Sequence, residues 1–479
     1  MQTNSTHTKA SLFIIFCTWL AARTYIYYFN WAYFPAAHAD DSAFNMWYLP
    51  PEIVKNHFAE SMLYLRGEPP LPQLFLGMLM KIAGWPFAWP LDSMLLSIAT
   101  LITAFLMRAI MLRFNFHQAL ATGLAAAWCI YPASLGVEVA AFPTAFYEAL
   151  PEFFFTLALW LCLCCFDTEK TNRWLWLFGF TGILLSMSRS TLSWIFLLPT
   201  FIVIFIPTNN KKKIIIGCLA MFMQLLWSVK NYAVYGQFNF ETASDIGQNI
   251  LSTVMNTGHF QEFHAFSILQ HPNDSFVQYG LPCLAKSDVA CAEKFMPHTT
   301  ERDSHLKQQL STSSVLWGES YFMHEMSRRI KPLFSEFLLR NPSIAIDMVY
   351  RSYKLFWGNI YWQVSYIPGL DADTLLLNTN VIFEKYKWLN ILSIHLLAPV
   401  ALFLICTTLI KRRSLNPLQV GFLYALLSFC YVALVSSLGD HGENARYRVD
   451  VEPLVWLLPF LSFRCIADWL SQAKAKRRA

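Results

Sequence analysis

Two adjacent acids are the first residues of this chain whose types and spacing could do chemistry. Asp40 and Asp41 closely follow the first apolar run and precede an aromatic stretch that contains Trp47 and Tyr48. Two carboxylates this close repel each other, so one of them holds its proton more tightly and can act as an acid or base near neutral pH. Because Asp is also a favoured N-cap residue, the alternative is a solvated helix cap before residues 42–48.

Further ionisable residues lie inside or at the ends of apolar runs. Arg23 lies in the first run, Glu148 and Glu152 lie near the start of another, and Arg189 lies between two more. Charges inside or at the rim of membrane helices are expensive and usually face a cavity or a partner. Each alone could form a structural ion pair or reach the lipid headgroups. Together they predict a charged cavity that opens outward.

Two arginines flank Tyr447 just before the last apolar run. If this segment is extended, the alternation of side chains places Arg446 and Arg448 on one face, where they would clamp a phosphate. The alternative is binding of anionic lipid headgroups at the membrane interface. A lipid-linked phosphate would satisfy both interpretations.

The composition predicts an all-α polytopic membrane protein. Hydrophobic residues make up 55% of the 479 residues and charged residues 14%, and the mean hydropathy is +0.37. Such a chain is too apolar for a water-soluble globule and long enough for many spans. The net charge of +5 comes from basic clusters beside apolar runs, where they set membrane orientation, so nucleic acid is not implied.

About ten apolar runs are long enough to be membrane-spanning helices. We predict spans at Ser11–Phe29, Leu91–Leu112, Gln118–Gly136, Thr144–Phe166, Trp174–Met187, Leu192–Pro207, Ile214–Val229, Trp388–Ile410, Leu418–Leu438 and Pro453–Leu470. Basic clusters such as Lys211–Lys213 and Lys411–Arg413 then fall inside, which places both termini in the cytoplasm. The first run is expected to stay as an anchor, because it lacks a small-residue cleavage site.

The remaining segments predict three regions. Residues 1–229 form an N-terminal transmembrane module whose first outer loop covers 30–90, residues 230–387 form a mostly helical extracytoplasmic domain, and residues 388–479 return to the membrane. In the first loop, Leu71–Trp89 is interrupted by prolines and predicts an outer juxtamembrane or re-entrant helix. In the domain, the apolar spacing of Ser320–Leu339 predicts a helix that Asn341-Pro342 would end.

Cys283 and Cys291 lie close together in the predicted extracytoplasmic domain, whereas the other cysteines fall in or beside the spans. An oxidising compartment would close the pair into a small disulfide loop. The alternative is two unpaired thiols. Zinc binding is disfavoured, because no His or Cys partner lies at zinc-site spacing around them.

The order of several short motifs resembles a known enzyme family. These are the acid after the first span, Gly67–Leu71, Tyr147–Leu150, Ser186–Arg189, Lys230–Gly236, Arg446–Arg448 and the pair Glu452-Pro453. The series is similar to that of bacterial glycosyltransferases of the GT-C fold, such as protein O-mannosyltransferases and the aminoarabinose transferase that modifies lipid A. The resemblance covers nearly the whole membrane part and is weaker in the outer domain. The colinear order carries it, since no single motif is specific.

The resemblance implies an inverting transfer of sugar from a polyprenyl-phosphate carrier to a glycan, lipid or protein acceptor outside the cytoplasmic membrane. Asp41, or else Asp40, would take the proton of the acceptor hydroxyl. Arg446, Arg448 and Arg189 would stabilise the leaving phosphate. The remaining residues of this prediction line the site, namely Glu148, Tyr447, Arg23 and Lys230. The site would face the periplasm in the bacterial cell envelope.

Two other functions and one cofactor stay open. A transporter or flippase of lipid-linked sugar would also line a pathway with charges, although it should carry them at midplane depth in two corresponding halves. A lipid-linked glycan polymerase or ligase would also work outside with paired arginines, but it should place its key residues in late loops. A divalent cation on the first-loop acids and Glu148 stays an alternative, since carboxylate oxygens suit a hard cation.

Overall fold

The computed structural model describes residues 5–30, 58–59, 70–131, 144–167, 171–208, 210–235, 238, 246–296, 298–299, 321–358, 375–412, 414–439 and 444–478. All the regular structure in this part of the chain is helical, as the composition predicts. In the N-terminal half lie α1 (Ser5–Asn30), α5 (Pro70–Ala83), α6 (Trp85–Arg113), α7 (Gln118–Cys129), α9 (Thr144–Cys164), α10 (Thr171–Ser186), α11 (Leu197–Ile202) and α12 (Asn210–Tyr235).

The second half contains a group of shorter helices followed by three long ones. The shorter helices are α13 (Ile246–Asn256), α14 (Phe260–Gln270), the π-helix η4 (Phe276–Gly280), α15 (Leu281–Ala285), α16 (Val289–Glu293), α18 (Tyr321–Arg340) and α19 (Pro342–Phe356). The long ones are α21 (Leu375–Arg412), α22 (Pro417–Gly439) and α23 (Asn444–Arg478).

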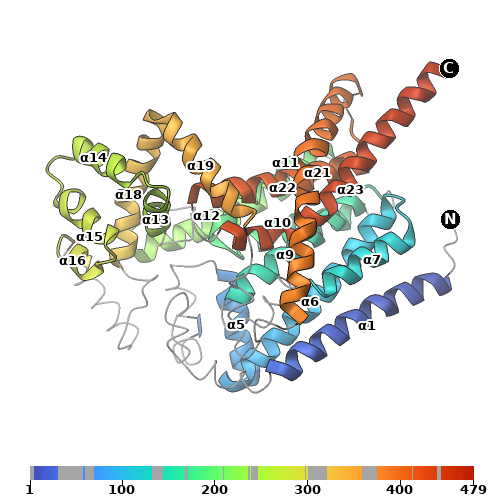
Figure 1. The fold of residues 1–479 in the computed structure, drawn as a ribbon, viewed down its shortest axis with the longest axis horizontal. Helices are drawn as coiled ribbons and strands as arrows, with labels where there is room; N and C mark the ends of the chain where they lie inside the picture. The colour runs from blue at the N-terminus through green and yellow to red at the C-terminus, as the bar shows by residue number, and fades with distance from the viewer. Residues whose placement is uncertain are drawn as a thin grey trace.

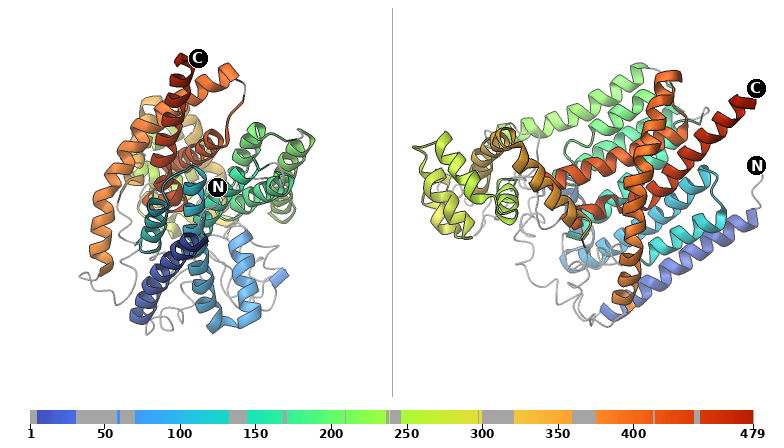
Figure 2. Two further views of the ribbon diagram at one scale, coloured as in Figure 1. Left: turned by 90° about the vertical axis from the view of Figure 1, so that its right-hand side faces the viewer. Right: turned by 45° about the horizontal axis from the view of Figure 1, so that its top comes forward.

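The long helices form a bundle, and the shorter ones gather at one end of it in a group that we call the outer domain, after the location that the sequence predicts (Figure 1). Helices α13 to α18 make up this domain, and α19 leads from it back to the bundle. The start of α1 and the end of α23 both lie at the opposite end, as Figure 1 and the right view of Figure 2 show. This arrangement agrees with a multi-pass membrane protein that carries a helical domain on one side.

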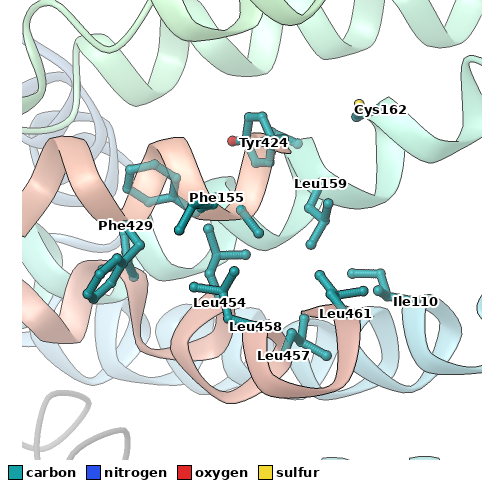
Figure 3. Packing of buried hydrophobic residues seen from close by; sticks show 14 of the residues in the cluster. Ile110, Phe155, Leu159, Cys162, Tyr424, Phe429, Leu454, Leu457, Leu458 and Leu461 are labelled. Atoms are coloured by element: carbon teal, nitrogen blue, oxygen red, sulfur yellow. The ribbon is translucent and has the colours of Figure 1, made fainter. Parts of the chain in front are cut away.

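Helix α23 lies at the centre of the bundle, in contact with α9, α21 and α22. Figure 3 shows side chains of these helices packed in the core, among them Phe155, Leu159, Tyr424, Leu454, Leu458 and Leu461. At Gly421 of α22, a Cβ atom would come within 2.8 Å of Leu163 on α9. Such close approach at a small residue is typical of membrane helix pairs, which associate mainly through van der Waals packing.

Five described helical segments are long and apolar enough to cross a membrane. They are Leu91–Arg113, Asn210–Ala233, Lys387–Lys411, Pro417–Leu438 and Tyr447–Ala475. Each matches a predicted span, and the count of about ten stays a prediction.

The predicted span Leu192–Pro207 is not one continuous helix. The chain there forms the 3₁₀ turn η2 (Ser190–Leu192), the short helix α11 and a second 3₁₀ turn, η3 (Val203–Phe205). Pro199 lacks an N–H and its ring disfavours helix in the preceding turn, which explains why α11 does not extend backward. Gln224 of α12 donates a 2.9 Å hydrogen bond to the carbonyl of Ser193 and so satisfies part of this irregular backbone.

The juxtamembrane segment predicted at Leu71–Trp89 is a helical hairpin. Helix α5 ends at Ala83 and α6 begins at Trp85, with Gly84 between them at φ 78°. A positive φ favours glycine, because it lacks the Cβ that would clash there. The backbone N–H of Leu71 donates a 3.2 Å bond to the carbonyl of Met187, which ties the start of α5 to the turn after α10.

The outer domain has its own core, which includes Phe263, Phe276, Phe322 and Phe337. Helix α18 confirms the helix predicted at Ser320–Leu339, and it ends at Arg340 just before Asn341-Pro342.

Charged side chains tie α18 to the neighbouring π-helix η4. Arg329 of α18 pairs with Asp274, just before η4, at 2.9 Å and with Glu325 at 3.0 Å. Burial raises the pKa of Glu325, but hydrogen bonds from Arg328 and Arg329 outweigh it and lower that pKa to about 2. The stabilisation by this carboxylate is therefore complete above its ordinary pKa of 4.5 and is lost as the pH falls toward 2.

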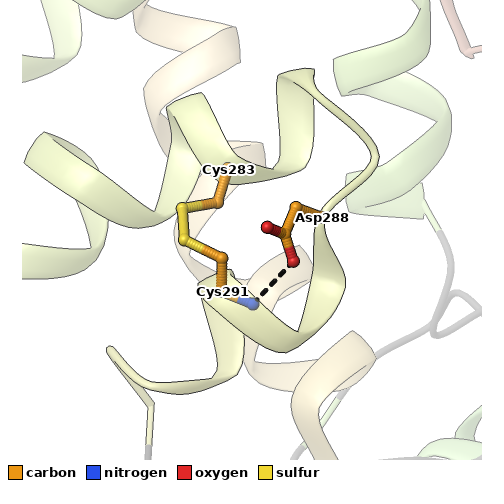
Figure 4. Close-up of a disulfide and its surroundings, with 3 residues drawn as sticks. All are labelled: Cys283, Asp288 and Cys291. Atoms are coloured by element: carbon orange, nitrogen blue, oxygen red, sulfur yellow. Dashed lines mark hydrogen bonds between the residues drawn. A yellow bond between two sulfur atoms is a disulfide. The ribbon is translucent and has the colours of Figure 1, made fainter.

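Cys283 and Cys291 are joined by a disulfide between α15 and α16 (Figure 4). Their Cα atoms are 5.7 Å apart. Between them, the carboxylate of Asp288 accepts a 2.9 Å hydrogen bond from the backbone N–H of Cys291 and caps the first turn of α16. The disulfide and this hydrogen bond therefore fix the same short loop.

Replacing both cysteines with serine is expected to loosen this loop. Loop-closure entropy predicts a cost of about 2.5 kcal/mol for a loop of this length. The measurement is the rate of protease cleavage within residues 281–296 of the purified protein, compared with a Cys406→Ser control in α21. An unchanged cleavage rate in the double serine variant would show that the disulfide does not stabilise the loop.

Candidate functional site

The N-terminal part of α23 carries a buried arginine that makes several hydrogen bonds in the bundle core. Arg448 is 1% exposed, and its Nε donates a 2.9 Å hydrogen bond to the Glu452 carboxylate. One Nη atom donates to the backbone carbonyls of Phe356 and Gly358, each at 3.2 Å. The Trp357 ring lies 5.7 Å from the guanidinium carbon. The segment at the end of α19 thus surrounds this cation and holds it in one position.

Glu452 is bound from the other side by two aromatic donors. Its Oε1 accepts hydrogen bonds from the Tyr131 hydroxyl at 3.0 Å and from the Trp456 indole N–H at 3.2 Å. Tyr131 and Trp456 also meet edge to face, with ring centroids 5.1 Å apart. Both charges of the pair are therefore hydrogen-bonded, which is the condition for a buried ion pair to be tolerated.

The Arg448–Glu452 pair lines a pocket of about 240 Å³. Along α23 the lining changes from these charged residues to Val455 and Phe460, and α7 adds Leu124. The remaining lining residues are Tyr131, Trp357, Trp456 and, from α21, Lys387 and Asn390. The pocket thus lies between helices of the bundle, with cationic and polar groups in one part and apolar groups in another.

A second buried ion pair lies on a different face of α23. Arg189, in the turn after α10, donates to Asp450 at 2.7 Å, and both side chains are almost fully buried. The Arg189 guanidinium carbon lies 4.1 Å from the centre of the Tyr447 ring. Asp450 is two residues from Arg448, and such positions point about 200° apart on a helix. The start of α23 is therefore bound on one side by Arg189 and on the other by the carbonyls of Phe356 and Gly358 and the hydroxyl of Tyr131.

Arg23 extends this polar region toward α1. It is buried, donates to the Ser97 hydroxyl of α6 at 3.2 Å and also donates to the backbone carbonyl of Cys129. Cys129 ends α7, two residues before Tyr131, which binds Glu452. The structure therefore buries Arg23, Arg189 and Arg448 in the bundle, with Arg23 linked through the end of α7 to the Arg448 side of α23 and Arg189 bound on another face of that helix.

The predicted arginine clamp does not have the extended backbone it requires. Residues 444–478 form one helix, so α23 begins before Arg446. In a helix, positions two apart do not share a face. Arg448 is committed to Glu452 and two carbonyls, and the side chain of Arg446 lies outside the described residues.

The remaining predicted site residues are placed only in part. Asp40 and Asp41 lie outside the described residues. Glu148 lies in the first turns of α9, and its side chain is also outside them. Lys230 lies on α12 with its Nζ 3.6 Å from the centre of the Trp227 ring, and it does not line the pocket.

A divalent-cation site is not found in the described part of the chain. There, no group of three His, Cys, Asp or Glu side chains lies close enough together to hold a metal ion. The carboxylates suggested for such an ion include Asp40, Asp41 and the side chain of Glu148, which the structure does not describe.

Several residues of this region were not identified from the sequence. Glu452 was named only as part of a motif and Asp450 was not named, and the i,i+4 spacing of Arg448 and Glu452 is the signal that could have identified a helical ion pair. Lys387 and Asn390 carry no local signal, since only packing of α21 against α23 brings them to the pocket. Asp92, buried at the start of the α6 span with one carboxylate oxygen that has no partner among the described residues, was also missed.

No protein-family model matches this chain, and no curated protein sequence matches it. Among solved structures, the chain is similar to the archaeal oligosaccharyltransferase AglB from Archaeoglobus fulgidus, in complex with an inhibitory peptide and a dolichol-phosphate. The identity is 11%, the TM-score is 0.43, and the match covers 98% of this chain and 51% of that one. This chain therefore spans about half the length of the archaeal protein.

Proposed function

We propose that this protein transfers a sugar from a polyprenyl-phosphate carrier to an acceptor on the outer side of the cytoplasmic membrane. The observation that carries the proposal is the pocket at Arg448, which combines cationic and apolar lining between membrane helices. The colinear sequence motifs, which include Arg448 and Glu452, also support it. The outer domain and the bundle end that carries Arg448 would then face the periplasm, with both termini in the cytoplasm.

The pocket lining matches the two parts of a lipid-linked phosphate. Lys387 supplies positive charge for the phosphate, Arg448 adds a guanidinium whose charge Glu452 balances in part, and Asn390 supplies an uncharged hydrogen-bonding group. Leu124 and Phe460 supply apolar surface for the first isoprene units. A volume of about 240 Å³ suits the phosphate and the adjoining part of the chain, with the rest of the lipid between helices.

The chemistry of transfer needs a base and stabilisation of the leaving group. Asp41, or else Asp40, takes the proton of the acceptor hydroxyl as its oxygen attacks the anomeric carbon. The bond from that carbon to the phosphate oxygen breaks, and the phosphate gains negative charge. Arg448 is fixed by Glu452 and by the carbonyls of α19, so its charge needs no rearrangement during the reaction. Attack opposite the leaving phosphate inverts the anomeric carbon.

The experiment that tests this function uses the full-length protein in proteoliposomes with radiolabelled polyprenyl-phosphate sugars. Transfer or hydrolysis would release polyprenyl phosphate, which chromatography separates from the intact donor. We expect release that depends on the protein and rises when an envelope extract supplies acceptors. Movement of intact donor across the bilayer without any release would identify a flippase and contradict the proposal.

A further inference from the structure

Helix α19 connects the outer domain with the bundle. Its residue Met348 belongs to the core of the outer domain, whereas Phe356 and the following Trp357 belong to the core of the bundle. The buried residues Met348, Ser352 and Phe356 recur every four positions and form one face of the helix. The opposite face is therefore free of the protein's own core.

That opposite face exposes large apolar side chains next to basic ones. Ile346 is 71% exposed and Tyr350, four residues later, is 56% exposed. The Nζ atom of Lys354 lies 4.2 Å from the centre of the Tyr350 ring, and Arg351 pairs with Asp347 at 2.8 Å. Scattered exposed apolar residues are normal on proteins, but this set recurs at helical spacing on one face. We define Ile346, Tyr350 and Lys354 as the exposed face of α19.

Helix α19 contacts a helix of membrane-spanning length through Tyr353, which is next to Lys354 of the exposed face. The Tyr353 hydroxyl and His395 Nε2 of α21 are 2.9 Å apart, and the rings also meet at 5.9 Å. His395 lies within the span Lys387–Lys411, where Leu392 and Leu396 expose more than half of their surface. Such leucines on a spanning helix face lipid. The contact at Tyr353 therefore joins α19 to a helix that has exposed leucines on both sides of His395.

We propose that the exposed face of α19 is embedded in the outer leaflet of the membrane and is covered by phospholipid. An amphipathic helix with aromatic and basic residues beside apolar ones is typical of helices that lie in the membrane interface. Tyrosine is enriched at the headgroup level, and Lys354 beside it would meet the phosphates of anionic lipid. The proposal does not depend on sugar transfer.

This lipid contact would lie directly beside the pocket. Four residues after Ser352, the same helix ends in the segment whose carbonyls at Phe356 and Gly358 bind Arg448. If α19 is embedded in the outer leaflet, the segment that ends it and binds Arg448 would be held at a defined depth in the membrane. The outer domain would thereby be held against the membrane at the same place where the pocket opens between the helices.

Depth-dependent quenching tests the proposal in nanodiscs that contain phosphatidylethanolamine and phosphatidylglycerol. A genetically encoded fluorescent amino acid replaces Ile346 in one variant and Leu269 in the control. Leu269 is also apolar and 78% exposed, but it lies on α14 in the outer domain. We expect lipids spin-labelled near the headgroup to quench position 346 at least two-fold more than position 269, and aqueous iodide to show the reverse order.

Two results would overturn the proposal. Equal quenching of positions 346 and 269 by the labelled lipids would place the exposed face of α19 in water. Protection of position 346 from both the lipid and the iodide quenchers would mean that another protein chain covers it. Unchanged thermal unfolding of both labelled variants would show that neither probe disturbs the fold.

Discussion

Replacing both Asp40 and Asp41 with asparagine is expected to lower sugar transfer by about 10²–10⁴-fold, the usual contribution of general base catalysis. Asparagine has nearly the same size and polarity but cannot accept the proton of the attacking hydroxyl. Of the single variants, Asp41→Asn should lower the rate more than Asp40→Asn, because Asp41 lies nearer the aromatic segment that would hold it in place. The measurement is the initial rate of polyprenyl phosphate release at saturating donor.

The control for this prediction is donor binding. The two acids act on the acceptor, so affinity for the lipid-linked sugar should change little in either variant. An Asp288→Asn variant, in the disulfide loop of the outer domain, serves as a matched acid far along the chain and should keep its activity. Full turnover in the Asp40→Asn, Asp41→Asn double variant would remove both acids from the mechanism.

Replacing Arg448 with methionine is expected to destabilise the bundle strongly. The change leaves the Glu452 carboxylate buried without its cation, and it leaves the carbonyls of Phe356 and Gly358 without their donor. Breaking a buried ion pair by removing one partner typically costs about 3–5 kcal/mol. The measurement is the midpoint of thermal unfolding of the protein purified in detergent.

A double variant separates the stability of this pair from its function. With Arg448→Met, the added change Glu452→Gln removes the unpaired charge, and glutamine still accepts from Tyr131 and Trp456. We therefore expect the double variant to recover most of the lost stability but none of the sugar transfer. A single Arg448→Met variant that unfolds at the wild-type temperature would show that the pair contributes nothing to the fold.

The all-α fold class and several individual helices could be predicted from the sequence, because apolar periodicity is a local signal. The helix at Ser320–Leu339 follows its apolar spacing, and Asn341-Pro342 ends it as expected. The interrupted segment at Leu192–Pro207 shows the limit of hydropathy alone. Its composition is apolar enough for a span, but the backbone there consists of two 3₁₀ turns and the short helix α11.

The candidate site was harder to predict, because distant segments build it. The last helix begins at Asn444 and not at Pro453, where the predicted span begins. Arg448 and Glu452 pair with each other at i,i+4 spacing, so these charged residues can belong to the helix and need not lie in a loop before it. Tyr131, Lys387 and Arg448 lie far apart in the sequence and meet only through helix packing. No local pattern specifies such a meeting.

The central claim is that the pocket at Arg448 binds the phosphate of a polyprenyl carrier. Equilibrium binding of radiolabelled polyprenyl phosphate to the protein in nanodiscs tests it most directly, with Lys387→Gln as the pocket variant and the exposed Lys474→Gln, in the last turns of α23, as the matched control. Loss of a charge-assisted hydrogen bond predicts affinity about 10-fold weaker for Lys387→Gln and wild-type affinity for Lys474→Gln. Equal affinity in all three proteins would contradict the claim.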